Sequence, residues 1–130
     1  MGIDFSAHGT AMIVVKNNIV TIDAIGPWNL EYFMTLHIRL VQAISQIEDD
    51  KYAVLLKPIG EAVAGQDCYK VHLDFIKQGK AKAVAINISL CETPVITRNL
   101  LHKIYTDARL EHQFFNDDQS ALKWLDTKLY

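Results

Sequence analysis

The side chains of this sequence that could carry chemistry are five histidines, two cysteines and a scatter of carboxylates. A metal site needs several ligands that converge with a defined geometry, and the histidines form neither an HExxH motif nor an H-x-H pair. His37 and His72 fall on helix faces that we expect to point inward. We therefore predict ordinary packing or surface roles for the histidines, and no bound metal. They are His8, His37, His72, His102 and His112.

The two cysteines offer one further candidate for chemistry. Cys68 and Cys91 have no spacing for zinc or for a redox CxxC pair, so we expect two reduced thiols. Cys91 is followed by Glu92 and lies shortly before a predicted helix, whose N-terminus could lower the pKa of the thiol. A reactive Cys91 is therefore one hypothesis, and an ordinary loop cysteine is the other. The sequence has no GxSxG, phosphate-loop or GxGxxG motif, and we expect no cofactor.

Two further features could bind a ligand. Lys77, Lys80 and Lys82 cluster at a helix–strand joint, where they could meet a phosphate or an anionic lipid or simply form a solvated turn. Trp28 combines a large apolar face with one hydrogen-bond donor. It either packs against the helix that follows it or contributes to a working surface, and in the second case we expect it to be partly accessible.

Composition bounds the class of protein. Hydrophobic residues make up 50% and charged residues 22%, and the formal net charge is −2. This balance can bury a core, and it argues against a nucleic-acid partner, because such binders are usually basic. No apolar run approaches the ~20 residues that a membrane-spanning helix needs. We expect one cytoplasmic domain over residues 1–130, with no signal peptide and a loose segment at residues 1–8.

The chain must also supply the elements that position these residues. Two β-branched runs flank Asn17-Asn18, a pair that suits a type I′ hairpin turn because asparagine tolerates positive φ. Helical spacing then alternates with short apolar runs. The expected elements are strands Thr10–Lys16 and Ile19–Ile25, a helix from Leu30 to Glu48 capped by Asn29, strand Lys51–Lys57, a helix from Ala64 or Gln66 to Gln78, strand Ala81–Ile88, helix Val95–Asp107, strand Leu110–Phe115 and a terminal helix capped by Asn116.

This order, β-β-α-β-α-β-α-β-α, predicts an α/β fold. Alternating strands and helices form a mostly parallel five-stranded sheet with four helices, and the N-terminal hairpin adds one antiparallel strand. Met34 and Val41 belong to the apolar stripe that we expect the first helix to bury. In the terminal helix, we expect Trp124 and Leu125 to be largely buried against the sheet.

Three segments carry a resemblance to a known family. Gly26-Pro27-Trp28-Asn29 looks like a G-x-W entry into a long helix, and Ile76–Ala85 looks like a helix–glycine–strand joint. The segment Phe114–Leu125 is similar to a closing F-x-D-x-x-x-A-L-x-W-L pattern. Together they resemble the bacterial SpoIIAA-like, or STAS-like, domains, whose fold is related to the lipid-binding CRAL-TRIO group. The resemblance covers nearly the whole chain, from about Gly9 to Leu129.

The resemblance implies a regulatory or binding domain, with one departure. Sporulation anti-sigma-factor antagonists of this family are switched by phosphorylation of a serine at the helix N-terminus after the third strand. Here the corresponding stretch, Lys57–Gln66, contains no Ser, Thr or Asp. We therefore predict that this chain has no phosphoserine switch at that position.

In open α/β sheets, ligands bind outside the carboxyl ends of the parallel strands. The candidate binding residues at that edge are Trp28, Asn29, Lys57, Glu61, Ser89 and Glu92. The leading hypothesis is a non-enzymatic module that acts there through a protein partner, a second copy of itself, or a small apolar or anionic ligand. One alternative is a small hydrolase or transferase that uses Glu61, Glu92 and a histidine. Another is a lipid-binding module, for which 130 residues are few to enclose a full lipid.

Overall fold

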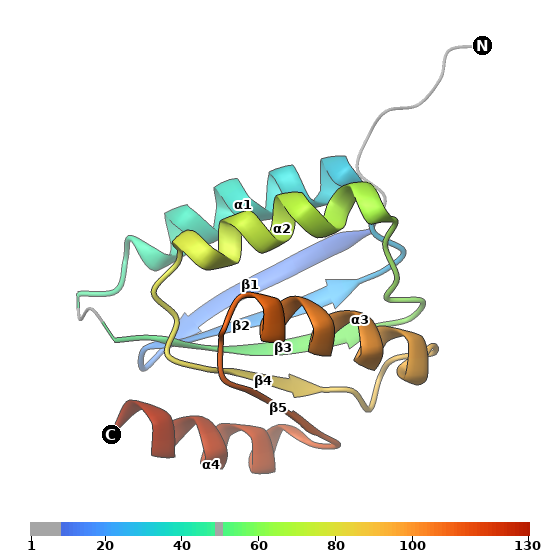
Figure 1. Cartoon of the computed structure of the whole chain (residues 1–130). Coiled ribbons are helices and arrows are strands. Elements are labelled where there is room, and N and C mark those ends of the chain that lie inside the picture. Colours follow the sequence, from blue (N-terminus) through green and yellow to red (C-terminus); the bar gives the residue numbers. More distant parts are fainter. Residues whose placement is uncertain (1–8, 49–50) are drawn as a thin grey trace.

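The computed structural model describes residues 9–48 and 51–130, so the predicted loose segment at residues 1–8 lies outside the described part of the chain. Figure 1 shows the order of the elements. They are β1 (Thr10–Lys16), β2 (Ile19–Ile25), α1 (Leu30–Ile44), β3 (Ala53–Ile59), α2 (Gln66–Gln78), β4 (Val84–Asn87), α3 (Pro94–Asp107), β5 (His112–Phe115) and α4 (Asp118–Leu129).

The described strands form one five-stranded sheet in the order β1-β2-β3-β4-β5. β1 runs antiparallel to β2, and β2, β3, β4 and β5 run parallel to one another. The hairpin turn has Asn17 at φ 52° and Asn18 at φ 64°, the two positive values that a type I′ turn requires. The predicted fold class is confirmed, and β1 and β2 have the predicted bounds.

Helices cover the two faces of the sheet unequally: α1, α2 and α3 lie on one face and α4 lies on the other (Figure 1). The alternation of β2 sets this division. Val20, Ile22 and Ala24 are buried in the core beneath α1, α2 and α3, whereas Thr21 and Asp23, which point the other way, are only partly buried. A second, smaller core joins β3 and β4 to α4.

Some predicted element ends differ from the structure. β3 continues through Pro58 to Ile59 instead of ending at Lys57. The backbone N of Val54 donates to Ala83 O, just before β4, at 3.0 Å. Because backbone groups alternate in direction along a strand, the backbone N of Pro58 also points toward β4. The β3–β4 pairing ends at Leu56, so the missing N–H of Pro58 leaves no ladder bond unmade.

Helix faces and caps account for the other differences. α1 ends at Ile44, and Met34 and Val41 are exposed, not buried. Each lies one residue, about 100° of rotation, beyond a position that α1 buries. The predicted cap of α4 was wrong by one residue: Asp117, not Asn116, caps the helix, and its Oδ1 accepts from Ser120 N at 2.7 Å.

α4 is held on the sheet chiefly by Leu125, which is fully buried. Trp124 is also mostly covered, although less completely than Leu125. It packs beside Phe115 with the ring centroids 5.8 Å apart, and the Lys128 ammonium lies over its other part at 5.2 Å from the centroid.

We predict that Leu125→Ala lowers the free energy of unfolding by about 2–5 kcal/mol, the usual cost of a cavity left by a buried leucine. Trp124→Ala should cost less, because Trp124 is only partly buried whereas Leu125 is fully buried. Urea denaturation followed by circular dichroism measures both changes. A larger loss for Trp124→Ala than for Leu125→Ala would contradict this packing of α4.

Candidate functional site

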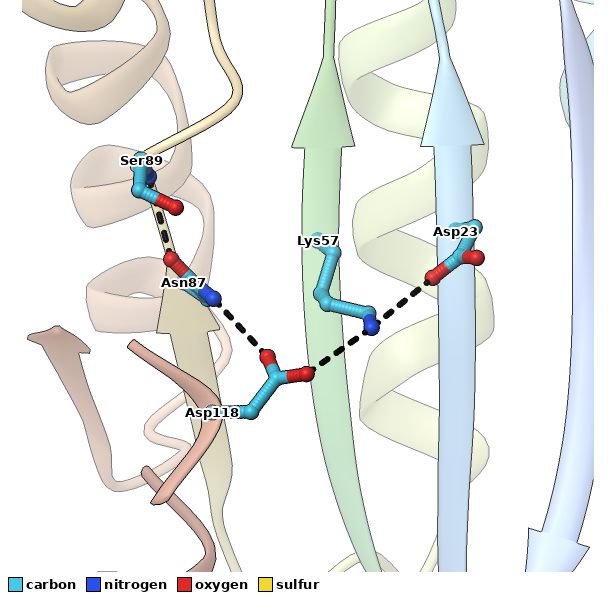
Figure 2. A network of polar contacts seen from close by, with 5 residues as sticks. All are labelled: Asp23, Lys57, Asn87, Ser89 and Asp118. Carbon is cyan, nitrogen blue, oxygen red and sulfur yellow. Dashed lines mark hydrogen bonds and ion pairs between the residues drawn. The ribbon is translucent and has the colours of Figure 1, made fainter. Parts of the chain in front are cut away.

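Part of the predicted edge is a polar network on the α4 face of the sheet (Figure 2). Lys57 Nζ lies 3.1 Å from Asp118 Oδ2 and 3.5 Å from Asp23 Oδ1. Asn87 Nδ2 donates to Asp118 Oδ1 at 2.8 Å, and Ser89 N donates to Asn87 Oδ1 at 3.0 Å. Lys57 and Ser89 are thus joined through residues that the sequence did not single out.

The charges in this network stabilise one another. Hydrogen bonds from Asn87 and Lys57 hold the pKa of Asp118 below its ordinary value, against the opposing effect of burial. Burial lowers the pKa of Lys57, but Asp118 and Asp23 outweigh it, and the net pKa is raised. A general base needs a pKa near the working pH. This ammonium and this carboxylate are both fully charged at neutral pH, so the network suits attachment of α4 better than proton transfer.

Glu61 and Glu92 lie in loops at the same edge with exposed side chains. Their backbones have structural roles: Glu92 N donates to Gly60 O at 2.8 Å, and a Cβ placed on Gly26 would meet Glu61 O at 2.1 Å. Only glycine therefore fits at position 26. Among the described residues, the paired histidine side chains contact one another and neither glutamate. His102 Nδ1 lies 3.0 Å from His112 Nε2, and His37 pairs with His72.

The cysteines are both free and sit in packed surroundings. Cys91 Sγ donates to Thr97 Oγ1 at 3.2 Å, and Thr97 Oγ1 donates to Ala62 O at 2.7 Å. This chain of contacts ties the loop after β4 to the loop after β3. Burial, with a contribution from Asp67, raises the pKa of Cys68 to about 11, which is the opposite of what an activated thiol needs.

A hollow lies elsewhere in the described part of the chain, between the sheet and the layer of α1, α2 and α3. It is a cavity of about 600 Å³ whose walls are mostly apolar side chains from β2, β3, β4 and the three helices. Trp28 lines one end, beside the start of α1. Lys77, Lys80 and Arg109 line the other end, where α2 and α3 finish.

Trp28 belongs to the wall of this cavity and not to an exposed edge. Its exposed fraction is only 7%, so the alternative of a partly accessible indole is wrong, and Trp28 packs against α1 as the other alternative expected. Asn29 acts as the predicted cap of α1: its Oδ1 accepts from Tyr32 N at 2.9 Å. The cap fixes the first turn of α1, which places the Tyr32 ring on Trp28 with centroids 5.9 Å apart and planes 15° apart.

Two buried polar atoms at this end of the cavity have no hydrogen-bond partner among the described residues. They are Trp28 Nε1 and the hydroxyl of Tyr32. Burial raises the pKa of the Tyr32 hydroxyl above its ordinary value, although Arg39 opposes the shift, so the group is a neutral phenol. Leaving such a group unpaired costs about 1–3 kcal/mol. Sequence inspection could not find this feature, since it depends on what surrounds the two side chains.

A histidine pair lies between α1 and α2, as the predicted inward faces required. His37 Nε2 and His72 Nδ1 are 2.8 Å apart, and the two rings stack at 8°. Phe75 stacks on His37 with centroids 4.0 Å apart. Burial lowers the pKa of His37 to about 4 and, together with His37, that of His72 to about 3. Both rings are therefore neutral at pH 7, and His72, which lines the cavity, brings it no charge.

Within residues 9–48 and 51–130, no three His, Cys, Asp or Glu side chains gather where they could hold a metal ion. No helix in the same part of the chain is both long and apolar enough to cross a membrane.

Comparison with known proteins finds matches among solved structures. No protein-family model matches the chain, and neither does any curated protein. A solved structure of an uncharacterised protein from the DUF3478 family, from Shewanella loihica PV-4, is described as having a SpoIIAA-like fold. It is 17% identical to this chain and aligns over 96% of it and 98% of its own length, with a TM-score of 0.62.

The chain has a SpoIIAA-like fold. At this level of identity the match concerns the fold and not the activity. It agrees with the resemblance drawn from the segments around Trp28, Gly79 and Trp124. In this SpoIIAA-like domain, the indole of Trp28 packs inside the helical layer, and Gly26 allows the loop after β3 to come close.

We predict that the histidine pair makes the domain less stable in acid. Both pKa values are lower in the folded chain than the ordinary 6.5 of the unfolded chain, so the unfolded state takes up protons first. The free energy of unfolding should fall as the pH drops from about 6.5 to about 4, by up to about 1.4 kcal/mol per pH unit for each histidine.

Urea unfolding at a series of pH values measures the slope, and NMR titration of the imidazole protons reports each ring directly. The two rings should remain neutral at pH 5 in the folded chain. If either ring titrates near 6.5 without loss of structure, the buried pair does not exist in solution.

Proposed function

We propose that this domain is a non-enzymatic binding module that holds an elongated apolar ligand between the sheet and the layer of α1, α2 and α3. The observation that carries the proposal is the cavity of about 600 Å³. Ligand sites commonly have volumes of about 300–1,000 Å³, apolar walls and a few placed polar groups. This cavity matches that description in its size and its mostly apolar walls. Trp28 and Tyr32, which line it, each carry a buried polar atom with no hydrogen-bond partner among the described residues.

The elongated shape follows from the elements that line the cavity. Gly65 and Cys68, at the start of α2, contribute to the wall, and so do Gln78 and Gly79 at its end. α2 has 13 residues and is therefore about 20 Å long at about 1.5 Å per residue. A long, narrow molecule would use this space better than a compact one.

A non-catalytic role is supported by the state of the groups that chemistry would need. The Lys57–Asp118 pair is fully charged and partly covered, Cys68 has a raised pKa, and the glutamates are not joined to a histidine. The hydrolase or transferase alternative would require these groups to come together, and they have separate structural contacts.

We further propose a cytoplasmic regulatory role in which a protein partner or a second copy of the chain contacts α1. Met34 and Ile38 are 56% and 63% exposed on its outer face. The opposite face of the same helix carries Tyr32 and Leu36, which line the cavity. A ligand could thus alter the position of a helix that a partner contacts. The net charge of −2 favours a partner other than nucleic acid.

We predict that the purified domain binds the uncharged apolar dye Nile red, with a saturable rise in fluorescence. Ala64→Phe and Ala81→Phe each place a ring in the wall of the cavity, and each should weaken dye binding at least about tenfold while keeping or raising stability, because they fill space. Ala43→Phe is the matched control, since Ala43 lies on α1 outside this cavity.

Thermal unfolding identifies any variant that fails to fold. Ala64 and Ala81 lie at opposite ends of the cavity, so one variant still tests the proposal if the other does not fold. The proposal is wrong if the dye does not bind, or if it binds folded Ala64→Phe, Ala81→Phe and Ala43→Phe equally well.

A further inference from the structure

The two ends of the cavity differ in chemistry, and this difference defines the ligand more closely. We propose that the ligand is a single-chain amphipathic acid that binds in one direction, with its anionic group at Lys77, Lys80 and Arg109 and a neutral oxygen at its far end beside Trp28 and Tyr32. This inference rests on the proposed function, because it assigns the ligand of the same cavity.

The outer end carries only positive charge. Lys77 and Lys80 flank the end of α2, Arg109 follows α3, and all three are exposed while lining the cavity. Among the described residues that line the cavity, none is Asp or Glu. Because His72 is neutral, Lys77, Lys80 and Arg109 carry the only formal charges among the described residues that line the cavity. An anion at this end gains charge-assisted hydrogen bonds and keeps contact with water.

The inner end is apolar except for two unpaired groups. Trp28 and Tyr32 are 7% and 3% exposed, and Trp28 Nε1 can only donate a hydrogen bond. Among the described residues that line the cavity, no cation lies at this end. Arg39, whose charge acts on Tyr32, has an exposed side chain that donates to Ala11 O. Burying a carboxylate here would be costly. A hydroxyl or carbonyl oxygen would satisfy the indole N–H without adding charge.

The separation of the two ends requires a long ligand. Trp28 precedes the first residue of α1, whereas Lys77 and Lys80 flank the last residue of α2. α1 and α2 run side by side in the same direction along the sheet, so the start of α1 and the end of α2 lie at opposite ends (Figure 1). About 20 Å of α2 lies between the two polar ends. A chain with one polar group at each end can reach both, and a compact anion cannot.

The first test compares matched ligands by isothermal titration. We expect 16-hydroxyhexadecanoate to bind about tenfold more tightly than hexadecanoate, the effect of about one additional hydrogen bond. The difference should disappear in the double variant Trp28→Phe with Tyr32→Phe, which keeps the rings and removes both polar groups. Equal affinity of the two acids for the unmodified chain would overturn the assignment of the inner end.

The second test concerns the basic end. Lys77→Gln and Lys80→Gln should each weaken hexadecanoate binding several-fold and leave hexadecanol binding unchanged. Lys82→Gln is the matched control, because Lys82 is an exposed neighbour that does not line the cavity. If Lys82→Gln weakens the acid as much as the other two variants, attraction is not local to the cavity and the assignment fails.

The third test reads the direction of binding. In a Trp124→Phe background, Trp28 is the remaining tryptophan. Bromine quenches indole fluorescence at short range, so 16-bromohexadecanoate should quench Trp28 more strongly than 2-bromohexadecanoate. Stronger quenching by the 2-bromo acid would reverse the proposed direction.

The outcomes separate this inference from the function beneath it. If Nile red binds in the cavity and none of the acids does, the ligand class is wrong while the binding module stands. If neither the dye nor the acids bind, the proposed function itself is wrong.

Discussion

The two-residue period of β2 and β3 decides which side chains meet which layer. The register places Asp23 directly opposite Lys57, and Ile22 opposite Leu56 one step earlier. The charged pair therefore faces α4, and the aliphatic pair faces the cavity. A slip of one residue would exchange the faces and put an ammonium into the apolar hollow. The ion-pair network and the apolar cavity are thus two consequences of one register.

The cavity is a local departure from good packing in a domain that is otherwise well packed. Interiors of proteins are normally filled to the density of organic crystals, and unpaired buried polar groups are rare. Here an apolar hollow and two unpaired polar atoms, on Trp28 and Tyr32, occur together at the start of α1. Sites where stability is given up in this way are commonly functional. The same helix start is well capped by Asn29. The loss of stability therefore comes from the unfilled volume and the unpaired side-chain atoms and not from the end of the helix.

Local patterns were enough to predict most of the architecture. The Asn17-Asn18 turn and the alternation of β2 depend on neighbours in sequence, so the hairpin could be placed residue by residue. Asp118 could not be recognised, because its partner Lys57 is 61 residues away and meets it only through the docking of α4. For Trp28, packing against α1 and a place on an accessible edge were both open, since a sequence does not show what covers a ring. The cavity could not be predicted either. It exists because the side chains of several strands and helices do not fill the space between them, and the spacing of residues along a sequence does not show that volume.

The usual rule for α/β sheets directs attention to the carboxyl ends of the strands, but at this edge the loops are tied to one another. Gly60 N donates to Leu90 O at 3.1 Å, Glu92 N donates to Gly60 O at 2.8 Å, and Thr97 Oγ1 donates to Ala62 O at 2.7 Å. Backbone groups that would otherwise face a ligand are already used, and the loops after β3 and β4 form one packed unit. The opposite edge is tied as well, since Ala53 N donates to Asn18 O at 3.0 Å and Lys82 N donates to Tyr52 O at 2.9 Å. At that edge the ends of α2 and α3 bring three exposed cations to the wall of the cavity. The two edges therefore differ in the charge that they bring to the cavity and not in whether their segments are joined, and the three exposed cations distinguish the amino edge.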